Sequence, residues 1–461
     1  MDFNRSSVRS AVVLLMLSSG AALFPNLAEA QSVPGAGMHW VATWATAHQQ
    51  PRSFRSGRGG GRNGGPAPNA PVGTTDPSGR GGGAGRMPPP PGNPQSFNNQ
   101  TVRMIVRVSL GGSRVRVRLA NTFGATPLVI GAAHAALHLQ DSAILPGSDR
   151  ALSFGGKGTV TIPPGAEVLS DPISLTLPAL GELVLSVYVP SETGPASDHF
   201  SSFRTTWISK EGDLTSAAEF TDASTLEGWF WIAGVDVEAP ATAATIVAFG
   251  DSITDGATST VNADRSWPNE LARRLQANPA TARVAVVNEG IGGNRILSDE
   301  FGVNALARFD RDVLAQPGVK WLILLEGIND LNFPPRSGPQ IYKQASAEDL
   351  IVAMKQMVDR AHTHGIKVIG GTLTPFGRAT EYVEAQRQIL NEFIRNGKVF
   401  DGVADFDKAA RDPKDPMQFR EGYNNTDRLH PNDAGLKAMA EAIDLSLFAS
   451  APSRSGTVRR R

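Results

Sequence analysis

The stretch TIVAFGDSITDG, residues 245–256, decides the fold of this chain. Its first five residues form an apolar run, and the glycines that follow predict a tight turn at the end of a short buried strand. In open α/β sheets, ligands bind at the carboxyl ends of the strands. Ser252 therefore lies where a reactive side chain would meet a ligand, although a Gly-Asp-Ser turn taken alone is more often only a turn.

After residue 240 the sequence alternates between strand patterns and helix patterns. Together with residues 245–249, strands are expected at 283–288, 320–326, 366–372 and 399–405. Each is separated from the next by amphipathic segments or polar loops. This alternation predicts a parallel, doubly wound sheet with helices on both of its faces.

The expected helices carry recognisable start and stop residues. Ser346 and Asp349 form a capping box, and Gly365 closes the helix that follows. Ser266 precedes another helix start, and Asp433 is expected to cap a final helix that carries apolar residues as far as Leu447.

Residues 101–237 follow a period of two instead. Short alternating runs separated by Gly, Pro and Asp predict an all-β sandwich of jelly-roll type. Residues 39–47 resemble a further strand, with Trp40, Ala42 and Trp44 at alternate positions. Trp229 and Trp231 also lie two apart and are expected to share one packed face of a sheet.

Bulk composition limits the classes of function. The 461 residues are 41% hydrophobic and 19% charged with zero formal net charge, so neither a nucleic-acid partner nor an anionic membrane surface is indicated. With no cysteine, the chain has no disulfide, no thiolate metal site and no cysteine nucleophile.

The sequence divides into six expected segments. Residues 1–30 read as a signal peptide, with a basic start, an apolar middle too short to span a bilayer comfortably, and an Ala-Glu-Ala cleavage site. The protein is therefore expected to be secreted or periplasmic, without stable membrane insertion after cleavage. The others are an N-terminal strand segment (31–50), a disordered Gly/Pro/Arg-rich insertion (51–99), a β-sandwich domain (100–240), an α/β domain (241–450) and a disordered basic tail (451–461).

Polar motifs follow several of the expected strands, and they meet the needs of acyl transfer. A serine nucleophile requires a base, and the chain has eight histidines. His430 combines a position after the sheet that carries Ser252 with an acid, Asp427, three residues earlier, whose carboxylate could orient the imidazole. His199, by contrast, is expected among surface residues. Taken alone, His430 would equally suit an exposed capping residue.

Acyl transfer also needs donors for a developing oxyanion. Gly293, in the run Asn288-Glu289-Gly290-Ile291-Gly292-Gly293-Asn294, and Asn329, in Gly327-x-Asn329-Asp330, are candidates. Taken alone, Gly293 is more simply interpreted as part of a tight turn, and Asn329 as the first residue of an Asx-turn. The glycine block at 290–293 does not meet the Gly-x-Gly-x-x-Gly fingerprint, since it has no correctly spaced third glycine, and the chain has no Gly-x-Ser-x-Gly motif. Without His-Glu-x-x-His, no metal or other cofactor is expected.

The set of motifs resembles the SGNH, or GDSL, hydrolase family over roughly residues 244–449. That resemblance implies a flavodoxin-like three-layer α/β/α domain. It also implies that Ser252 is the nucleophile, His430 the base and Asp427 its orienter. Ser252, Gly293 and Asn329 would form the oxyanion hole. The stretches 40–44 and 111–117 resemble an N-terminal β region found on some bacterial members.

The expected function is therefore that of a serine esterase. The substrate would be a small-molecule or polysaccharide ester, with short-acyl or O-acetyl esters of carbohydrates favoured. A lipase or lysophospholipase, an acyltransferase with the same site, and a non-catalytic carbohydrate-binding protein are the alternatives.

Overall fold

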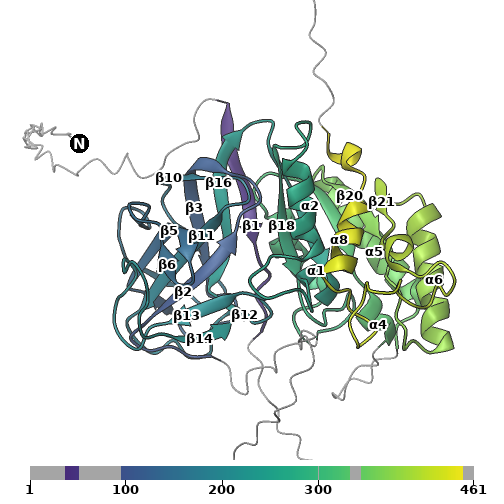
Figure 1. The fold of residues 1–461 in the computed structure, drawn as a ribbon, viewed down its shortest axis with the longest axis horizontal. Helices are drawn as coiled ribbons and strands as arrows, with labels where there is room; N and C mark the ends of the chain where they lie inside the picture. The colour runs from purple at the N-terminus through teal and green to yellow at the C-terminus, as the bar shows by residue number, and fades with distance from the viewer. Residues whose placement is uncertain (1–36, 51–94, 300, 333–343, 450–461) are drawn as a thin grey trace, which may run out of the picture.

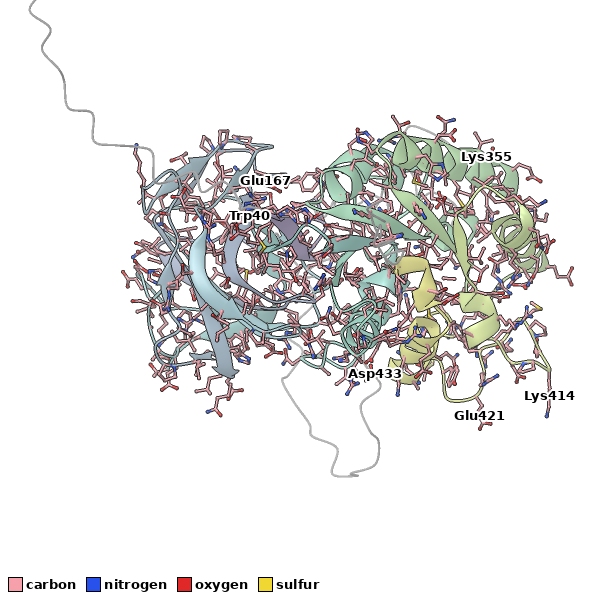
Figure 2. All side chains as sticks on the ribbon, turned by 90° about the horizontal axis from the view of Figure 1, so that it is seen from above. Trp40, Glu167, Lys355, Lys414, Glu421 and Asp433 are labelled. Carbon is pink, nitrogen blue, oxygen red and sulfur yellow. The ribbon has the colours of Figure 1, made fainter. Side chains whose placement is uncertain are left out.

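The computed structural model of the protein describes residues 37–50, 95–299, 301–332 and 344–449. A β-rich part and a part built on a parallel sheet lie side by side, with strand β1 at their junction (Figures 1 and 2). The predicted signal peptide, the basic tail and most of the predicted insertion lie outside the described residues.

Antiparallel sheets form the β-rich part, as the period of two predicts. One sheet contains β1 (Met38–Ala45), β16 (Ile232–Pro240), β3 (Gly112–Ala120) and β10 (Ile173–Leu177) in that order, with β9 (Glu167–Leu169) on β3. Another contains β14 (Ser224–Glu227), β13 (Thr205–Ile208), β2 (Gln100–Arg107), β11 (Glu182–Val189), β5 (Ala132–Gln140) and β6 (Ala143–Ile144), with β7 (Arg150–Ala151) on β5. Two short ribbons pair β12 (Asp198–His199) with β15 (Trp229–Phe230) and β4 (Leu128–Ile130) with β8 (Val160–Ile162).

Strand β1 contributes to both hydrophobic cores. Val41 and Trp44 pack in the core of the β-rich part, whereas Ala42 and Ala45 pack in the core of the parallel-sheet part. The register against β16 shifts between Ala42 and Trp44, as at a β-bulge. The expected alternation of Trp40, Ala42 and Trp44 is therefore broken, because an extra residue in one strand reverses the faces that follow it.

Two further expectations about the β-rich part were wrong. Residues 95–99 were assigned to the disordered insertion, but Phe97 is 2% exposed and packs edge-on against Phe230 and Trp231. Trp229 and Trp231 do not share one regular face, because Trp231 has a φ of +58° and lies between β15 and β16.

The predicted parallel sheet is confirmed. Its strand order is β18 (Val284–Gly290), β17 (Ala244–Gly250), β19 (Val319–Leu325), β20 (Lys367–Gly371) and β21 (Gly402–Ala404). Counted along the chain this is the order 2-1-3-4-5, whose ligand-binding crevice lies at the carboxyl ends of the first and third strands. Residues that follow β17 and β19 are therefore brought together.

Helices connect these strands. They are α1 (Ser252–Asp255), α2 (Trp267–Gln276), α3 (Ala305–Phe309), the π-helix η2 (Asp310–Leu314), α4 (Ile328–Asn332), α5 (Ala347–Thr363), α6 (Glu381–Asn396), α7 (Phe406–Ala410), α8 (Asp433–Glu441) and the 3₁₀ helix η3 (Leu445–Phe448). Within the described ranges, no helix is long and apolar enough to cross a membrane.

The predicted cap at the start of α5 is formed, whereas the cap at the start of α8 differs from the prediction. The capping box of Ser346 and Asp349 is formed at the start of α5. The N-cap of α8 is Asn432 rather than Asp433, and its side chain accepts from the N–H groups of Ala434 and Gly435. Asp433 instead accepts from the backbone N–H and hydroxyl of Thr260.

Candidate active site

Ser252 is the first residue of α1, directly after β17. The carboxylate of Asp251 accepts a hydrogen bond from the N–H of Ile253 and so caps this short helix. A Cβ at Gly250 would overlap the carbonyl of Leu325, and Gly256 ends the helix with a φ of +106°. The glycines of the quoted stretch therefore permit the sharp strand-to-helix turn that presents Ser252.

Ser252, His430 and Asp427 form a continuous chain of hydrogen bonds. Ser252 Oγ lies 2.8 Å from His430 Nε2, and His430 Nδ1 lies 2.6 Å from Asp427 Oδ2. The other Asp427 oxygen accepts from the N–H groups of Leu429 and His430, in a turn where Arg428 has a φ of +58°. The acid and the histidine three residues later thus meet across one turn.

The environment of Asp427 favours its charged form. Burial alone would raise its pKa, but the hydrogen bond and charge of the His430 ring, with two backbone N–H groups, lower the pKa to about 2. The carboxylate is therefore ionised throughout the range in which an esterase works, and it accepts the Nδ1–H of His430.

The glycine block at the end of β18 differs from residue to residue in what its backbone N–H groups face. The N–H of Gly290 donates to Asn288 Oδ1, and the N–H of Gly292 acts on the carboxylate of Asp255, whose pKa it lowers. Among the described residues, no acceptor is recorded for the N–H of Gly293. The N–H of Gly293 is therefore available to an oxyanion, whereas that of Gly290 is bonded to Asn288 and that of Gly292 faces Asp255.

Gly293 could not easily be another residue. Its φ is +76°, and a Cβ there would lie 2.5 Å from Cδ2 of Phe301. Both the backbone conformation and the ring packed against it require glycine.

Asn329 and Asp330, at the start of α4 beyond β19, fasten the loop that follows the glycine block. The amide of Asn329 donates to the carbonyl of Asn294 at 2.9 Å, which uses one of its two N–H bonds. The Asp330 carboxylate accepts from the N–H groups of Ile296 and Leu297, at 2.9 and 3.1 Å. Burial raises the pKa of Asp330 to about 6.

Comparison with known proteins assigns the parallel-sheet part of the chain to a family. Residues 248–438 match the model of the GDSL-like Lipase/Acylhydrolase family. Residues 248–438 form a GDSL-like lipase/acylhydrolase domain. The expectation of an enzyme that acts on ester bonds is confirmed at the level of this family, and the domain is called the GDSL domain below.

Solved structures similar to the chain include a protein described as of the G-D-S-L family and an acetylxylan esterase. A putative lipolytic protein of the G-D-S-L family from Desulfitobacterium hafniense DCB-2 is 25% identical over 43% of this chain and 96% of its own, with a TM-score of 0.34. Axe2, an acetylxylan esterase from Geobacillus stearothermophilus, is 20% identical over 46% of this chain and 97% of its own, with a TM-score of 0.35. No curated protein matches the chain significantly.

A buried arginine that sequence reasoning missed ties the GDSL domain together behind the serine. Arg308 donates to the backbone carbonyls of Gly250 and Glu289, to Asn294 Oδ1 and to the carboxylate of Asp312. It therefore joins the ends of β17 and β18 to the loop that Asn329 also holds. Nothing in its sequence context, a short helix, indicates this role.

Two buried acids lie beneath the nucleophile turn. Asp251 follows Gly250 in β17 and Glu326 follows Leu325 in β19, and Gly250 and Leu325 are partners in the parallel register. Burial raises the pKa of Asp251 to about 7 and that of Glu326 well above its usual value. Within the described ranges, no group of three or more His, Asp or Glu side chains could hold a metal ion.

His199 was expected among surface residues, and this was wrong. It is 1% exposed and lies 2.9 Å, through Nε2, from Oδ1 of Asp255 in the GDSL domain. Burial alone would lower the pKa of His199, but the Asp255 carboxylate raises it above its usual value. The sequence context of His199 is polar, and its burial comes from contacts with distant residues, Asp255 in the GDSL domain and Trp229 in the β-rich part.

Proposed function

We propose that the chain is a serine esterase in which Ser252 is the nucleophile, His430 the general base and Asp427 the group that orients the base. The observation that carries this proposal is the hydrogen-bond chain of 2.8 and 2.6 Å through the two nitrogens of His430. Since Asp427 is ionised and accepts from Nδ1, Nε2 is left with the lone pair that takes the serine proton.

The oxyanion donors in this proposal are the backbone N–H of Ser252, the backbone N–H of Gly293 and the side-chain amide of Asn329. The open N–H of Gly293 supports the choice of that glycine over Gly290 and Gly292. Asn329 keeps a second N–H after its bond to Asn294. Preorganised donors of this kind stabilise the charge that develops on the carbonyl oxygen.

The reaction then proceeds in two steps, acylation of Ser252 and hydrolysis of the acyl-enzyme. Ser252 Oγ bonds to the ester carbonyl carbon as its proton passes to His430 Nε2. Collapse of the tetrahedral intermediate breaks the bond to the alkoxy oxygen, which leaves as the alcohol with the proton from His430. Water then attacks the acyl-enzyme in the same way. The carboxylic acid is released and free Ser252 is regenerated.

We propose short-acyl esters, including O-acetyl groups of carbohydrates, as the substrates. We also propose action outside the cytoplasm, on the evidence of residues 1–30, and the domain boundaries given above. A three-layer α/β/α arrangement of the GDSL domain and a jelly-roll topology of the β-rich part belong to the same proposal.

The test compares Ser252→Ala with Ser446→Ala, an exposed serine in η3, on p-nitrophenyl esters from acetate to palmitate. We expect Ser252→Ala to lower kcat by about 10⁶-fold, to background, because the nucleophile is lost. Ser446→Ala should match the wild type. Hydrolysis retained by Ser252→Ala would reject the proposal.

Product analysis separates the alternatives. Acetate release from acetylated xylan with a preference for short acyl chains supports the carbohydrate-ester substrate. A maximum at long chains would indicate a lipase, and ester formation on an added alcohol in preference to hydrolysis would indicate an acyltransferase. Glycan binding without turnover of any ester would indicate a binding protein.

A further inference from the structure

His199 connects the β-rich part to the GDSL domain through both of its ring nitrogens. Nδ1 lies 2.8 Å from the carbonyl oxygen of Ala47, just beyond β1, and Nε2 lies 2.9 Å from Oδ1 of Asp255. Because a carbonyl can only accept, Nδ1 carries a proton and donates it to Ala47. The ring orientation is thereby fixed, and Nε2 faces the carboxylate.

Asp255 is the last residue of α1, the helix that Ser252 begins. Its backbone packs so closely on β18 that a Cβ at Gly290 would overlap the N–H of Asp255. Its side chain faces the N–H of Gly292. Asp255 thus belongs to the nucleophile helix and meets the glycine block twice, at Gly290 through its backbone and at Gly292 through its carboxylate, whose Oδ2 would lie 3.7 Å from a Cβ on Gly292.

Other residues of the β-rich part approach the same loop. Gln49 Nε2 donates to the carbonyl of Phe301 at 3.2 Å, and the ring of Phe301 packs where a side chain at Gly293 would be. Ser201 Oγ would lie 3.6 Å from a Cβ on Gly292. The glycine block is therefore held from the side of the β-rich part as well as from within the GDSL domain.

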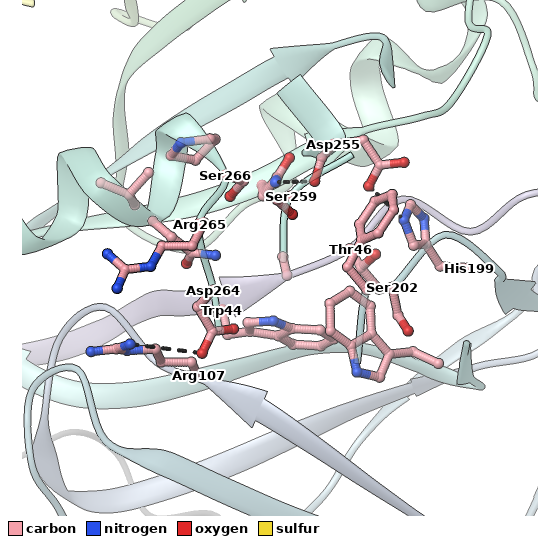
Figure 3. A pocket seen from close by; sticks show the side chains of 17 residues that line it. Trp44, Thr46, Arg107, His199, Ser202, Asp255, Ser259, Asp264, Arg265 and Ser266 are labelled. Atoms are coloured by element: carbon pink, nitrogen blue, oxygen red, sulfur yellow. Dashed lines mark hydrogen bonds and ion pairs between the residues drawn. The ribbon is translucent and has the colours of Figure 1, made fainter. Parts of the chain in front are cut away.

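His199 is one of the residues that line a hollow between the two parts. Figure 3 shows His199 and Asp255 next to each other on one side of its lining, above Trp44. The ring of Trp229 stacks on His199, with centroids 5.8 Å apart, and meets Trp44 edge-on. Ser252 is not among the lining residues, so the hollow lies to one side of the proposed reacting serine.

We propose that His199 is a positioning residue of the esterase: by holding Asp255, the β-rich part fixes the glycine block so that the N–H of Gly293 points at the oxyanion. This inference rests on the proposed function. It assigns the β-rich part a role in the chemical step, in addition to any role in binding the substrate.

If the contact between His199 and Asp255 were only structural, different results would be expected. Loss of a structural contact lowers the free energy of unfolding and leaves kcat of the folded protein unchanged. Loss of a positioning contact lowers kcat of the folded protein, with a smaller effect on KM, because the oxyanion charge develops in the transition state.

The chain offers a matched control in His48. It is also buried, and its ring nitrogens lie 2.9 Å from Thr122 Oγ1 and 2.9 Å from the carbonyl of Ile232, both in the β-rich part. A change at His48 removes a buried histidine with two hydrogen bonds and leaves the contact with Asp255 intact.

The experiment measures kcat and KM for p-nitrophenyl acetate, with thermal unfolding, for His199→Ala, His199→Gln, His48→Gln and Ser252→Ala. We expect kcat of His199→Ala to fall about 10- to 100-fold, less than the about 10²- to 10³-fold loss of an oxyanion donor itself. His199→Gln retains a donor for Asp255 and should recover part of the loss. His48→Gln should unfold at a lower temperature with a nearly normal kcat.

The two proposals fail in distinguishable ways. If Ser252→Ala is inactive while folded His199→Gln and His199→Ala keep the wild-type kcat, the positioning role is wrong and the esterase stands. If kcat of the His199 variants falls only in proportion to their unfolded fraction at the assay temperature, the contact is structural. If Ser252→Ala keeps its activity, the esterase proposal itself is wrong.

Discussion

Arg308 Nη2 donates to the carbonyl oxygen of Gly250 at 3.0 Å, two residues before the proposed nucleophile. The same guanidinium, fully buried, also satisfies Glu289, Asn294 and Asp312. One side chain therefore fixes three segments of backbone that meet at the site.

Arg308→Met should lower the free energy of unfolding by about 3–5 kcal/mol, because the carbonyls and the Asp312 carboxylate lose a buried partner. Urea unfolding followed by tryptophan fluorescence measures this. Lys437→Ala, which breaks an exposed pair with Glu441, should change the value by less than about 1 kcal/mol. A similar small change for Arg308→Met would contradict the role given to Arg308.

Gly293→Ala and Gly292→Ala should behave differently although they are neighbours. At Gly293 the φ of +76° costs an alanine about 1–2 kcal/mol, and the Phe301 ring must move. At Gly292 the new Cβ would make only ordinary contacts, at 3.6 Å with Ser201 Oγ and 3.7 Å with Asp255 Oδ2. We expect Gly293→Ala to lose both stability and kcat and Gly292→Ala to keep most of both, as measured by thermal unfolding and ester hydrolysis.

Asp427→Asn should reduce kcat by about 10³- to 10⁴-fold, because an amide no longer selects the tautomer of His430 with its proton on Nδ1. Since the pKa of Asp427 is about 2, the wild-type carboxylate stays ionised well below neutral pH. Its contribution to stability is present above the unfolded pKa of about 3.9 and is lost as the pH falls toward 2. A pH–rate profile of the two proteins checks the first point: Asp427→Asn activity equal to wild type at pH 7 would exclude the orienting role.

Asp251→Asn should stabilise the protein relative to wild type, and this gain should be larger at neutral and alkaline pH than at acidic pH. The folded pKa of Asp251 is about 7 and the unfolded value about 3.9, so the native state binds more protons between these values. Its contribution to the free energy of unfolding is therefore full below about pH 4 and declines as the pH rises through 7.

An asparagine keeps the oxygen that caps Ile253 and removes this decline. The advantage of Asp251→Asn over wild type in thermal unfolding should grow from pH 4 to pH 7 and then level off. Glu421→Gln, at an exposed carboxylate, is the control and should show no such growth. A constant difference across the range would mean that Asp251 titrates normally.

Thr245→Val should weaken the junction between the two parts. The Thr245 hydroxyl lies 2.9 Å from the carbonyl of Ala42 in β1 and 3.0 Å from that of Pro317. Its isosteric replacement removes the hydroxyl donor shared by these two carbonyls, which costs about 0.5–1.5 kcal/mol of unfolding free energy. Thr363→Val, at an exposed threonine bonded to the carbonyl of Asp359, should change the value by less than about 0.5 kcal/mol. Equal effects in urea unfolding would show that the Thr245 hydroxyl adds nothing to the junction.

The sheet was predictable because its strands are short apolar runs followed by glycine or polar residues, a pattern set by local chemistry. The contact between Asp427 and His430 was predictable for the same reason, since three residues span one turn. At α8 the local signal was ambiguous, because Asn432 and Asp433 are both good caps, and the choice depends on Thr260 binding the second of them.

The parts of the site that could not be predicted depend on contacts between distant segments. Arg308 bonds to the ends of β17 and β18 and to the loop at Asn294. His199 reaches Asp255 from the β-rich part of the chain. A polar residue in a polar stretch gives no sign that two hydrophobic cores will close around it. The register shift in β1 is likewise set by pairing with β16, far along the sequence.

Strand β1 has a consequence for synthesis of the chain. In the described structure its sheet pairing is with β16, residues 232–240, and its side chains complete both cores. On the ribosome β1 emerges long before β16, so it must wait for almost the entire β-rich part before it can pair. When β16 arrives, β17 follows within a few residues. The β-rich part therefore cannot close its core until the first strand of the parallel sheet is about to follow, so its folding is delayed relative to that of an N-terminal domain with only local pairings.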